Sequence, residues 1–191
     1  RTWGTRLRYT PPAISCHRHE ARARLGRHIL RRQAGFTLPP PGGHRAHGET
    51  HVSITKEELL ATLTPELAGE SAAAIQYVQH ASVITGGEYE SIIAELLVHS
   101  SEEMQHAISL NDQIDWLGGV PAVDVQVIKT SPDSTEMLEQ DLEGEMDAVR
   151  RYKERIAQAE SLQEYGLRRV LEDILIMEEE HARDLMTVLG K

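Results

Sequence analysis

Four long segments after residue 55 place an apolar residue at every third or fourth position, the spacing of one face of an α-helix. Such a pattern confines the chain to helices that share a core. The pairs Gly86-Gly87 and Gly118-Gly119 separate the first three segments. Thr55 caps a short first run, and Thr64-Pro65 is typical of a new helix start. The capping-box pattern Ser161–Glu164 is typical of another. We therefore predict helices over about 65–85, 88–117, 133–160 and 161–189.

The connections between these segments predict the topology. Those at 86–87 and near 161 are short, so each flanking pair forms an antiparallel hairpin. The segment 119–132 is long enough to reach ~45 Å, about the length of a 30-residue helix. We predict an all-α four-helix bundle with one long crossover. The low aromatic content of 4% favours helices over a β-barrel, and a single cysteine, Cys16, excludes a disulfide framework.

Charge divides the chain into two parts. Residues 1–50 hold ten Arg, no Lys and two acidic residues, whereas residues 51–191 hold ten basic and 28 acidic residues, so net charges of +8 and −18 make the total of −10. We predict a disordered basic tail over 1–52 and a folded domain over 53–191. The tail is an organelle leader, part of a fragment, or a stretch upstream of a later start near Val52. The acidic balance disfavours nucleic acid as a partner, and no apolar run spans a membrane, so we expect a cytoplasmic protein.

Six polar side chains interrupt the apolar faces. Burying an unpaired carboxylate is costly, so these interruptions need an explanation. Glu70 lies 16 residues before Gly86 and Glu103 lies 16 after Gly87, so the two are level in their hairpin. The second hairpin repeats this arrangement 75 positions later, as Glu145 follows Glu70. The interrupting residues are Glu70, Glu103, His106, Glu145, Glu178 and His181.

The chain thus carries two copies of the pattern Glu-x32-Glu-x2-His. Glu and His three positions apart on a helix can reach one metal ion, and this ligand set is that of dinuclear iron and manganese bundles. Four carboxylates balance two divalent ions, so we predict two Fe ions, with Mn as the alternative. Tyr77 and Tyr152 share the same faces, and we interpret them as hydrogen-bond donors to metal-bound carboxylates, with electron donors to the oxidised site or core aromatics as the alternatives. We expect His99 to be a satisfied core histidine, with an accessory iron site as the alternative.

The stretches LAGESAAAIQYVQHA (67–81), SEEMQHA (101–107) and EEEHA (178–182) resemble the ligand segments of the ferritin-like di-iron superfamily, bacterioferritin most closely, over residues 55–189. The resemblance implies a ferroxidase with all six residues as ligands, and Glu103 and Glu178 as ligands shared between the metals. It further implies oxidation of Fe(II) by O2 or H2O2 and storage of ferric iron in a homo-oligomeric shell. Met104 stands where bacterioferritins ligate haem b between two subunits.

Other functions stay open at this point. A short fifth helix follows this region in bacterioferritin, whereas this chain ends ten residues after His181, so shells of 24 or 12 subunits and a dimer are all compatible. A non-storing di-iron or di-manganese enzyme of the peroxidase or catalase type is the main alternative. The second alternative is a metal-free helical scaffold that binds a partner protein.

Overall fold

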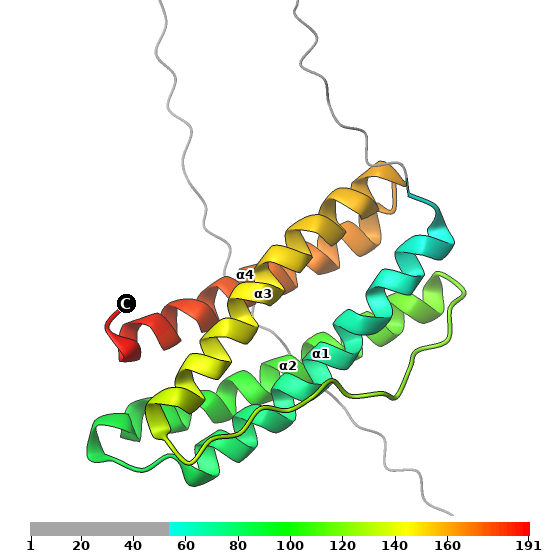
Figure 1. Ribbon diagram of the computed structural model, residues 1–191. Helices are drawn as coiled ribbons and strands as arrows, with labels where there is room; N and C mark the ends of the chain where they lie inside the picture. The colour runs from blue at the N-terminus through cyan, green and yellow to red at the C-terminus, as the bar shows by residue number, and fades with distance from the viewer. Residues whose placement is uncertain (1–53) are drawn as a thin grey trace, which may run out of the picture. The chain divides into compact units, whose positions relative to one another are not determined.

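The computed structural model describes residues 54–191, which form an antiparallel four-helix bundle (Figure 1). A single 3-10 turn, η1 (Gly87–Tyr89), precedes the second helix, and no strand occurs between residues 54 and 191. The all-α prediction is therefore confirmed, whereas the predicted tail over 1–52 lies outside the described residues. The helices are α1 (Lys56–Val83), α2 (Glu90–Trp116), α3 (Ser134–Ser161) and α4 (Tyr165–Leu189).

The crossover, predicted over 119–132, spans residues 117–133, connects α2 to α3 and runs along the bundle beside α1 (Figure 1). Polar contacts attach it there: Gln126 N donates to Ala68 O at 3.1 Å, and Lys129 N donates to Gln76 Oε1 at 2.7 Å. His80, which is fully buried on α1, lies 3.1 Å from Lys129 O and 2.9 Å from Asp141 of α3. The crossover is thus tied to both hairpins.

Helix α1 does not restart at Pro65, which corrects one prediction. The helix begins at Lys56, where Thr55 and Glu58 form a capping box, and continues through Pro65 to Val83. A proline inside a helix removes one backbone hydrogen bond and costs ~3 kcal/mol. Leu59 and Leu63 on the preceding turns are fully buried, so leaving the helix there would expose two core side chains. Burial of about 1.5–3 kcal/mol for each outweighs the proline penalty.

The predicted start of the last helix at Ser161 is also wrong. Ser161 is the last residue of α3, and its hydroxyl donates to Gln158 O at 2.8 Å. Ala159 is fully buried, and α3 stays helical through Ser161, so the residue predicted to cap the next helix is the end of this one. Gln163 then takes a left-handed conformation with φ of 60°, and α4 begins at Tyr165.

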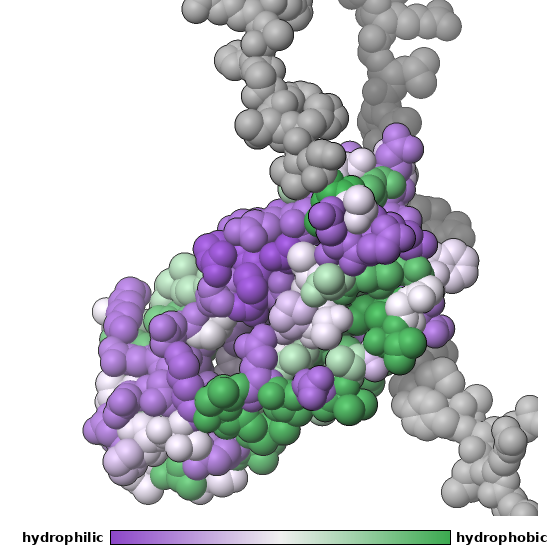
Figure 2. Space-filling model, turned by 45° about the vertical axis from the view of Figure 1, so that its right-hand side comes forward, coloured by the Kyte–Doolittle hydropathy of each residue, from purple (hydrophilic) through white to green (hydrophobic). Residues whose placement is uncertain are grey.

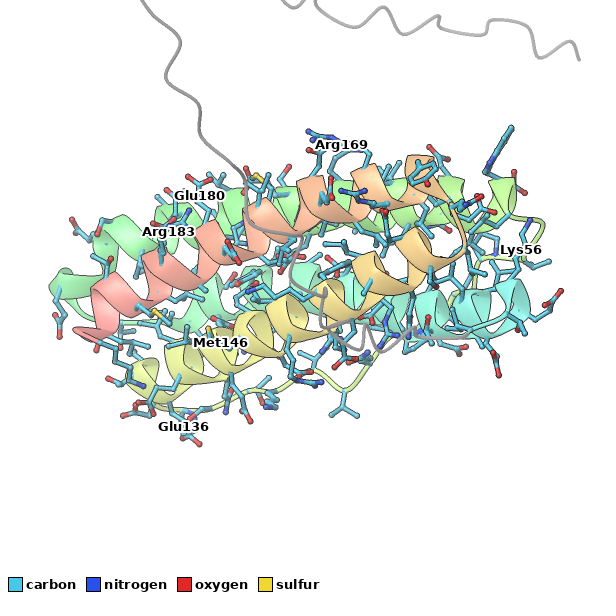
Figure 3. All side chains as sticks on the ribbon, turned by 90° about the horizontal axis from the view of Figure 1, so that it is seen from above. Lys56, Glu136, Met146, Arg169, Glu180 and Arg183 are labelled. Atoms are coloured by element: carbon cyan, nitrogen blue, oxygen red, sulfur yellow. The ribbon has the colours of Figure 1, made fainter. Side chains whose placement is uncertain are left out.

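The core consists of two apolar clusters with a polar layer between them. One cluster includes Leu63 and Leu110, and the other includes Leu96 and Leu138. Side chains such as Glu136 and Arg169 point outward instead (Figure 3). No helix within residues 54–191 is long and apolar enough to cross a membrane. The residues of the polar layer are those predicted to hold metal, and they are described next.

Candidate metal centre

Six buried side chains, one or two from each helix, converge in the polar layer. They form two overlapping clusters, in each of which the donor atoms lie within 4.8 Å of one another. Glu103 on α2 and Glu178 on α4 belong to both clusters, and each is 1% exposed. The first cluster is Glu70, Glu103, His106 and Glu178; the second is Glu103, Glu145, Glu178 and His181.

The two histidines point their Nδ1 atoms at the carboxylates. His106 Nδ1 lies 3.2 Å from Glu70 and 3.0 Å from Glu178. His181 Nδ1 lies 2.9 Å from Glu103 Oε1. The structure thus brings together all six residues that the sequence predicted, at one depth in the bundle. Their role as metal ligands is taken up as a proposal below.

Several donor atoms face the centre of the cluster without a hydrogen bond. Within the described part of the chain, Glu103 Oε1, Glu145 Oε2, Glu178 Oε1 and His181 Nδ1 are buried and have no hydrogen-bond partner. The contact between His181 Nδ1 and Glu103 Oε1 is short but lacks hydrogen-bond geometry. Buried polar atoms are rarely left in this state, because each one costs ~1–3 kcal/mol. Oxygen and imidazole donors aimed at a common point fit divalent iron or manganese.

The four carboxyl groups divide into two kinds. Burial, together with the charges of Glu70 and Glu145, raises the pKa of Glu103 well above its usual value. Burial and the surrounding carboxylates raise the pKa of Glu178 in the same way. Burial opposes ionisation of Glu70 and Glu145 too, but contacts with His106 and His181 lower the pKa of both. The two shared residues therefore hold protons most readily when no cation is present.

The pKa values of the two histidines are raised, whereas burial alone lowers the pKa of an imidazole. Burial lowers the pKa of His106, but contacts with Glu178 and Glu70 outweigh it and raise the pKa from 6.5 to about 9. Burial likewise lowers the pKa of His181, and contacts with Glu103 and Glu145 raise it to about 11. Without metal, protons on the histidines thus provide the positive charge that balances the carboxylates.

Two tyrosines cross the bundle to carboxylates of the opposite hairpin. Tyr77 on α1 donates a hydrogen bond to Glu145 on α3, and Tyr152 on α3 donates to Glu70 on α1 at 2.5 Å. Both rings are buried, and burial with the adjacent carboxylate charge raises the pKa of both hydroxyls. The hydroxyls therefore stay protonated and donate to the carboxylates; that these carboxylates bind metal stays a prediction.

Sequence reasoning missed Glu102 as a residue of this site. Glu102 Oε2 lies 3.0 Å from His181 Nε2, and so holds the ring whose other nitrogen faces the cluster. A carboxylate behind a metal-binding histidine fixes the tautomer and orientation of the ring. The two residues are 79 positions apart, and no spacing rule relates them.

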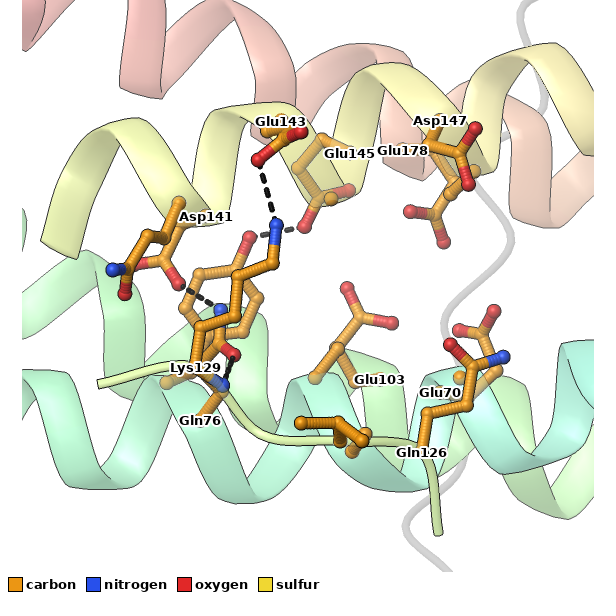
Figure 4. A pocket seen from close by; sticks show the side chains of 18 of the residues that line it. Glu70, Gln76, Glu103, Gln126, Lys129, Asp141, Glu143, Glu145, Asp147 and Glu178 are labelled. Carbon is orange, nitrogen blue, oxygen red and sulfur yellow. Dashed lines mark hydrogen bonds and ion pairs between the residues drawn. The ribbon is translucent and has the colours of Figure 1, made fainter. Parts of the chain in front are cut away.

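A cavity of about 220 Å³ leads from the crossover to the cluster (Figure 4). Glu70, Glu103, Glu145 and Glu178 line it, together with Gln126 and Lys129 of the crossover. Lys129 Nζ lies 2.6 Å from Glu143, so an ion pair stands at the rim, whereas the four buried glutamates stand inside. Small molecules and ions thus have a route to the buried donors.

Met104 lies outside the cluster, on the α2 surface, and is 48% exposed. Its position fits a ligand supplied at an interface between two copies of the chain, and haem binding there stays a prediction. Large exposed apolar residues accompany it on α1 and α2. Figure 2 shows apolar side chains gathered on part of the bundle surface. The large exposed apolar residues of α1, α2 and the crossover include Ile75, Val78, Leu97, Ile108, Val123 and Val127.

A four-helix bundle whose core joins two carboxylate–histidine clusters through shared glutamates defines the class of dinuclear metal–carboxylate proteins. Comparison with known proteins agrees. The chain belongs to the ferritin-like family, because its residues 60–191 match the ferritin-like domain. The predicted resemblance to the ferritin-like di-iron superfamily is therefore confirmed.

Individual relatives support the same assignment. The chain is 34% identical to the bacterial ferritin of Synechocystis sp. over 140 residues, covering 71% of this chain and 88% of that protein. It is 31% identical to the nutrient stress-induced DNA-binding protein of Nostoc sp. over 135 residues, covering 65% and 73%. A crystal structure of a ferritin-like, diiron-carboxylate protein from Bacillus anthracis superposes with a TM-score of 0.68 at 32% identity, covering 72% of this chain and 99% of that one. An iron-binding function of the ferritin type is thus supported.

Proposed function

We propose that this protein is a ferroxidase that oxidises Fe(II) with O2 or H2O2 and stores the ferric product. The observation that carries this proposal is the pair of buried clusters that share Glu103 and Glu178. Two shared carboxylates hold two cations close together, which is the arrangement required to take one electron from each of two ions. The ferritin-type relatives support the same conclusion.

The chemistry balances with Fe(II) as the substrate. Two Fe(II) ions supply two electrons, which with two protons reduce one O2 to H2O2, or one H2O2 to two waters. An oxygen-rich set with two imidazoles suits iron better than structural zinc, which prefers four sulfur and nitrogen ligands. The six residues of the centre hold the ions. Tyr77 orients the carboxylate of Glu145, and Tyr152 orients that of Glu70.

Storage requires an assembly, and the surface of the bundle supports one. A broad exposed apolar region on a monomer indicates a contact surface, and α1 and α2 carry such a region around Met104. We propose that it joins copies of this chain. One relative is named a DNA-binding protein; residues 51–191 carry a net charge of −18, which opposes binding of nucleic acid by the bundle itself.

Aerobic addition of Fe(II) to the full chain tests the ferroxidase proposal. We expect rapid ferric absorbance from the natural protein and a loss of ~100-fold or more in initial rate for Glu103→Ala combined with His106→Ala. The matched control is Glu180→Ala, two positions from Glu178 but exposed, which should keep the normal rate. Oxidation at an unchanged rate in the double variant would refute the site.

Size-exclusion chromatography after iron addition separates storage from the alternatives. A large particle that carries many iron atoms per chain supports storage. A small particle that holds two metal ions per chain supports the non-storing redox enzyme instead. A protein that binds no metal after purification, and is not stabilised by Fe(II) or Mn(II), supports the metal-free scaffold.

A further inference from the structure

A third group of potential ligands lies beside the dinuclear cluster, on the α2 and α4 side. Glu95 and His99 come from α2, four positions apart, and Asp184 comes from α4. His99 Nε2 lies 3.4 Å from Asp184 Oδ2 and 3.9 Å from Glu95 Oε1. The three donor atoms all lie within 4.8 Å of one another. None of these residues belongs to the six-residue centre.

His99 is only in part the satisfied core histidine that the sequence predicted, because one of its two ring nitrogens has a partner and the other has none. Its side chain is 1% exposed, and its Nδ1 has no hydrogen-bond partner among residues 54–191. Its Nε2 faces the two carboxylates, with one long hydrogen bond to Asp184 and a more distant contact with Glu95. A buried imidazole is costly unless its polar atoms are engaged, so packing alone does not account for this residue.

The internal repeat shows that the bundle does not require polar residues here. The positions related by the 75-residue shift are Val170 for Glu95, Ile174 for His99 and Ser109 for Asp184. These three counterparts line a cavity of about 280 Å³ next to His106. The fold therefore accepts apolar and small side chains at the equivalent place, and the polar group beside His181 is a departure from the symmetry.

The two carboxylates are open to solvent and lack a basic partner. Glu95 is 46% exposed and Asp184 is 42% exposed, and His99 is the one basic group paired with either among the described residues. Ligands of a first-row ion stand about 2.0–2.2 Å from it, hence about 3 Å apart at right angles and about 4 Å apart when opposite. The two distances from His99 Nε2, 3.4 Å to Asp184 and 3.9 Å to Glu95, fall in this range.

We propose that Glu95, His99 and Asp184 bind a third divalent transition-metal ion, with water at its remaining positions. One imidazole and two carboxylates form a donor set for Fe(II), Mn(II) or Co(II). The ring of His99 stacks on that of His181 with centroids 4.1 Å apart, so the ion is separated from the dinuclear centre by this pair of rings. The proposal goes beyond the ferroxidase function and does not depend on it.

Anaerobic equilibrium dialysis of the full chain against Co(II) tests the proposal. We expect about three tightly bound ions per natural chain and about two in the triple variant Glu95→Val, His99→Ile, Asp184→Ser. These substitutions copy the residues that the other half of the bundle uses, so the variant should fold. The matched control, exposed Glu88→Gln with Glu180→Gln, should keep about three. Equal binding by the natural chain and the triple variant would overturn the proposal.

A second measurement separates this site from the dinuclear one. In Glu103→Ala with His106→Ala, the ion held by the third site should remain and should show a paramagnetically shifted ring resonance from His99. Adding His99→Ile to that variant should abolish the resonance. If the resonance is absent from the Co(II)-loaded double variant while its helical content is unchanged, the third site is refuted whether or not the protein oxidises iron.

Discussion

Tyr152 on α3 donates a hydrogen bond to the carboxylate of Glu70 on α1 and so holds its orientation. Removing its hydroxyl in Tyr152→Phe leaves Glu70 Oε1 without its donor, while the aromatic ring still fills the core. We expect the rate of Fe(II) oxidation to fall by ~10–100-fold and unfolding to become easier by ~1–3 kcal/mol. Stopped-flow absorbance and thermal unfolding measure the two effects. Tyr165→Phe, at an exposed position, is the control, and equal rates in both variants would contradict the role.

Protons and metal ions compete for the same atoms of His106 and His181. The pKa values of about 9 and about 11 leave both rings protonated at pH 7 in the metal-free protein, and a ring must release its Nδ1 proton to bind metal. We expect release of ~2–4 protons per chain when Mn(II) fills the centre. Calorimetry in two buffers with different ionisation heats measures it, and a binding heat independent of the buffer would contradict it.

The same residues fix the sign of the pH dependence of stability. A histidine whose pKa is raised by folding stabilises the metal-free bundle fully below pH 6.5, and this contribution is lost as pH rises through about 9. Metal binding strengthens over the same interval because fewer protons must leave. We therefore expect the rise in melting temperature caused by Mn(II) to grow from pH 6 to pH 9. A constant or shrinking difference would be inconsistent with ligation by these rings.

Among the helices, α1 contains the clearest local conflict. Pro65 interrupts its backbone hydrogen bonds, yet the helix is continuous because the buried faces on both sides hold it. Pro65→Ala should restore a donor and stabilise the protein by about 1–3 kcal/mol without changing iron oxidation. Chemical denaturation measures the change. Destabilisation by this substitution would show that the proline is required for the packing contacts of α1.

The same conflict explains what the sequence could predict. Apolar periodicity and matched distances from the turns located the four helices and all six residues of the centre. Both the face of a helix on which a residue lies and its height in a hairpin follow from spacing along the sequence. Pro65 and Ser161 misled the prediction because local start signals were weaker than burial of neighbouring leucines and Ala159. Glu102 and Asp184 were missed because their partners lie on another helix, at separations that no local pattern records.

The whole bundle has two equivalent halves, and the centre lies where they meet. Glu70 and Glu145 each belong to one cluster, whereas Glu103 and Glu178 belong to both. We expect Glu70→Gln or Glu145→Gln to weaken one ion of the pair, and Glu103→Gln or Glu178→Gln to weaken both. Metal analysis after dialysis distinguishes these outcomes. Equal losses from all four substitutions would contradict the sharing.

The polar layer that separates the two apolar clusters has a further consequence for how the bundle opens. Neither cluster extends across the layer, so when no ion is bound the middle turns are held mainly by protons and a few hydrogen bonds. Helices ordinarily fray from their ends. Here, amide hydrogen exchange in the metal-free protein should instead be fastest in the middle turns of the helices, and it should slow sharply when metal binds. The supply of iron would then set how rigid the middle of the bundle is.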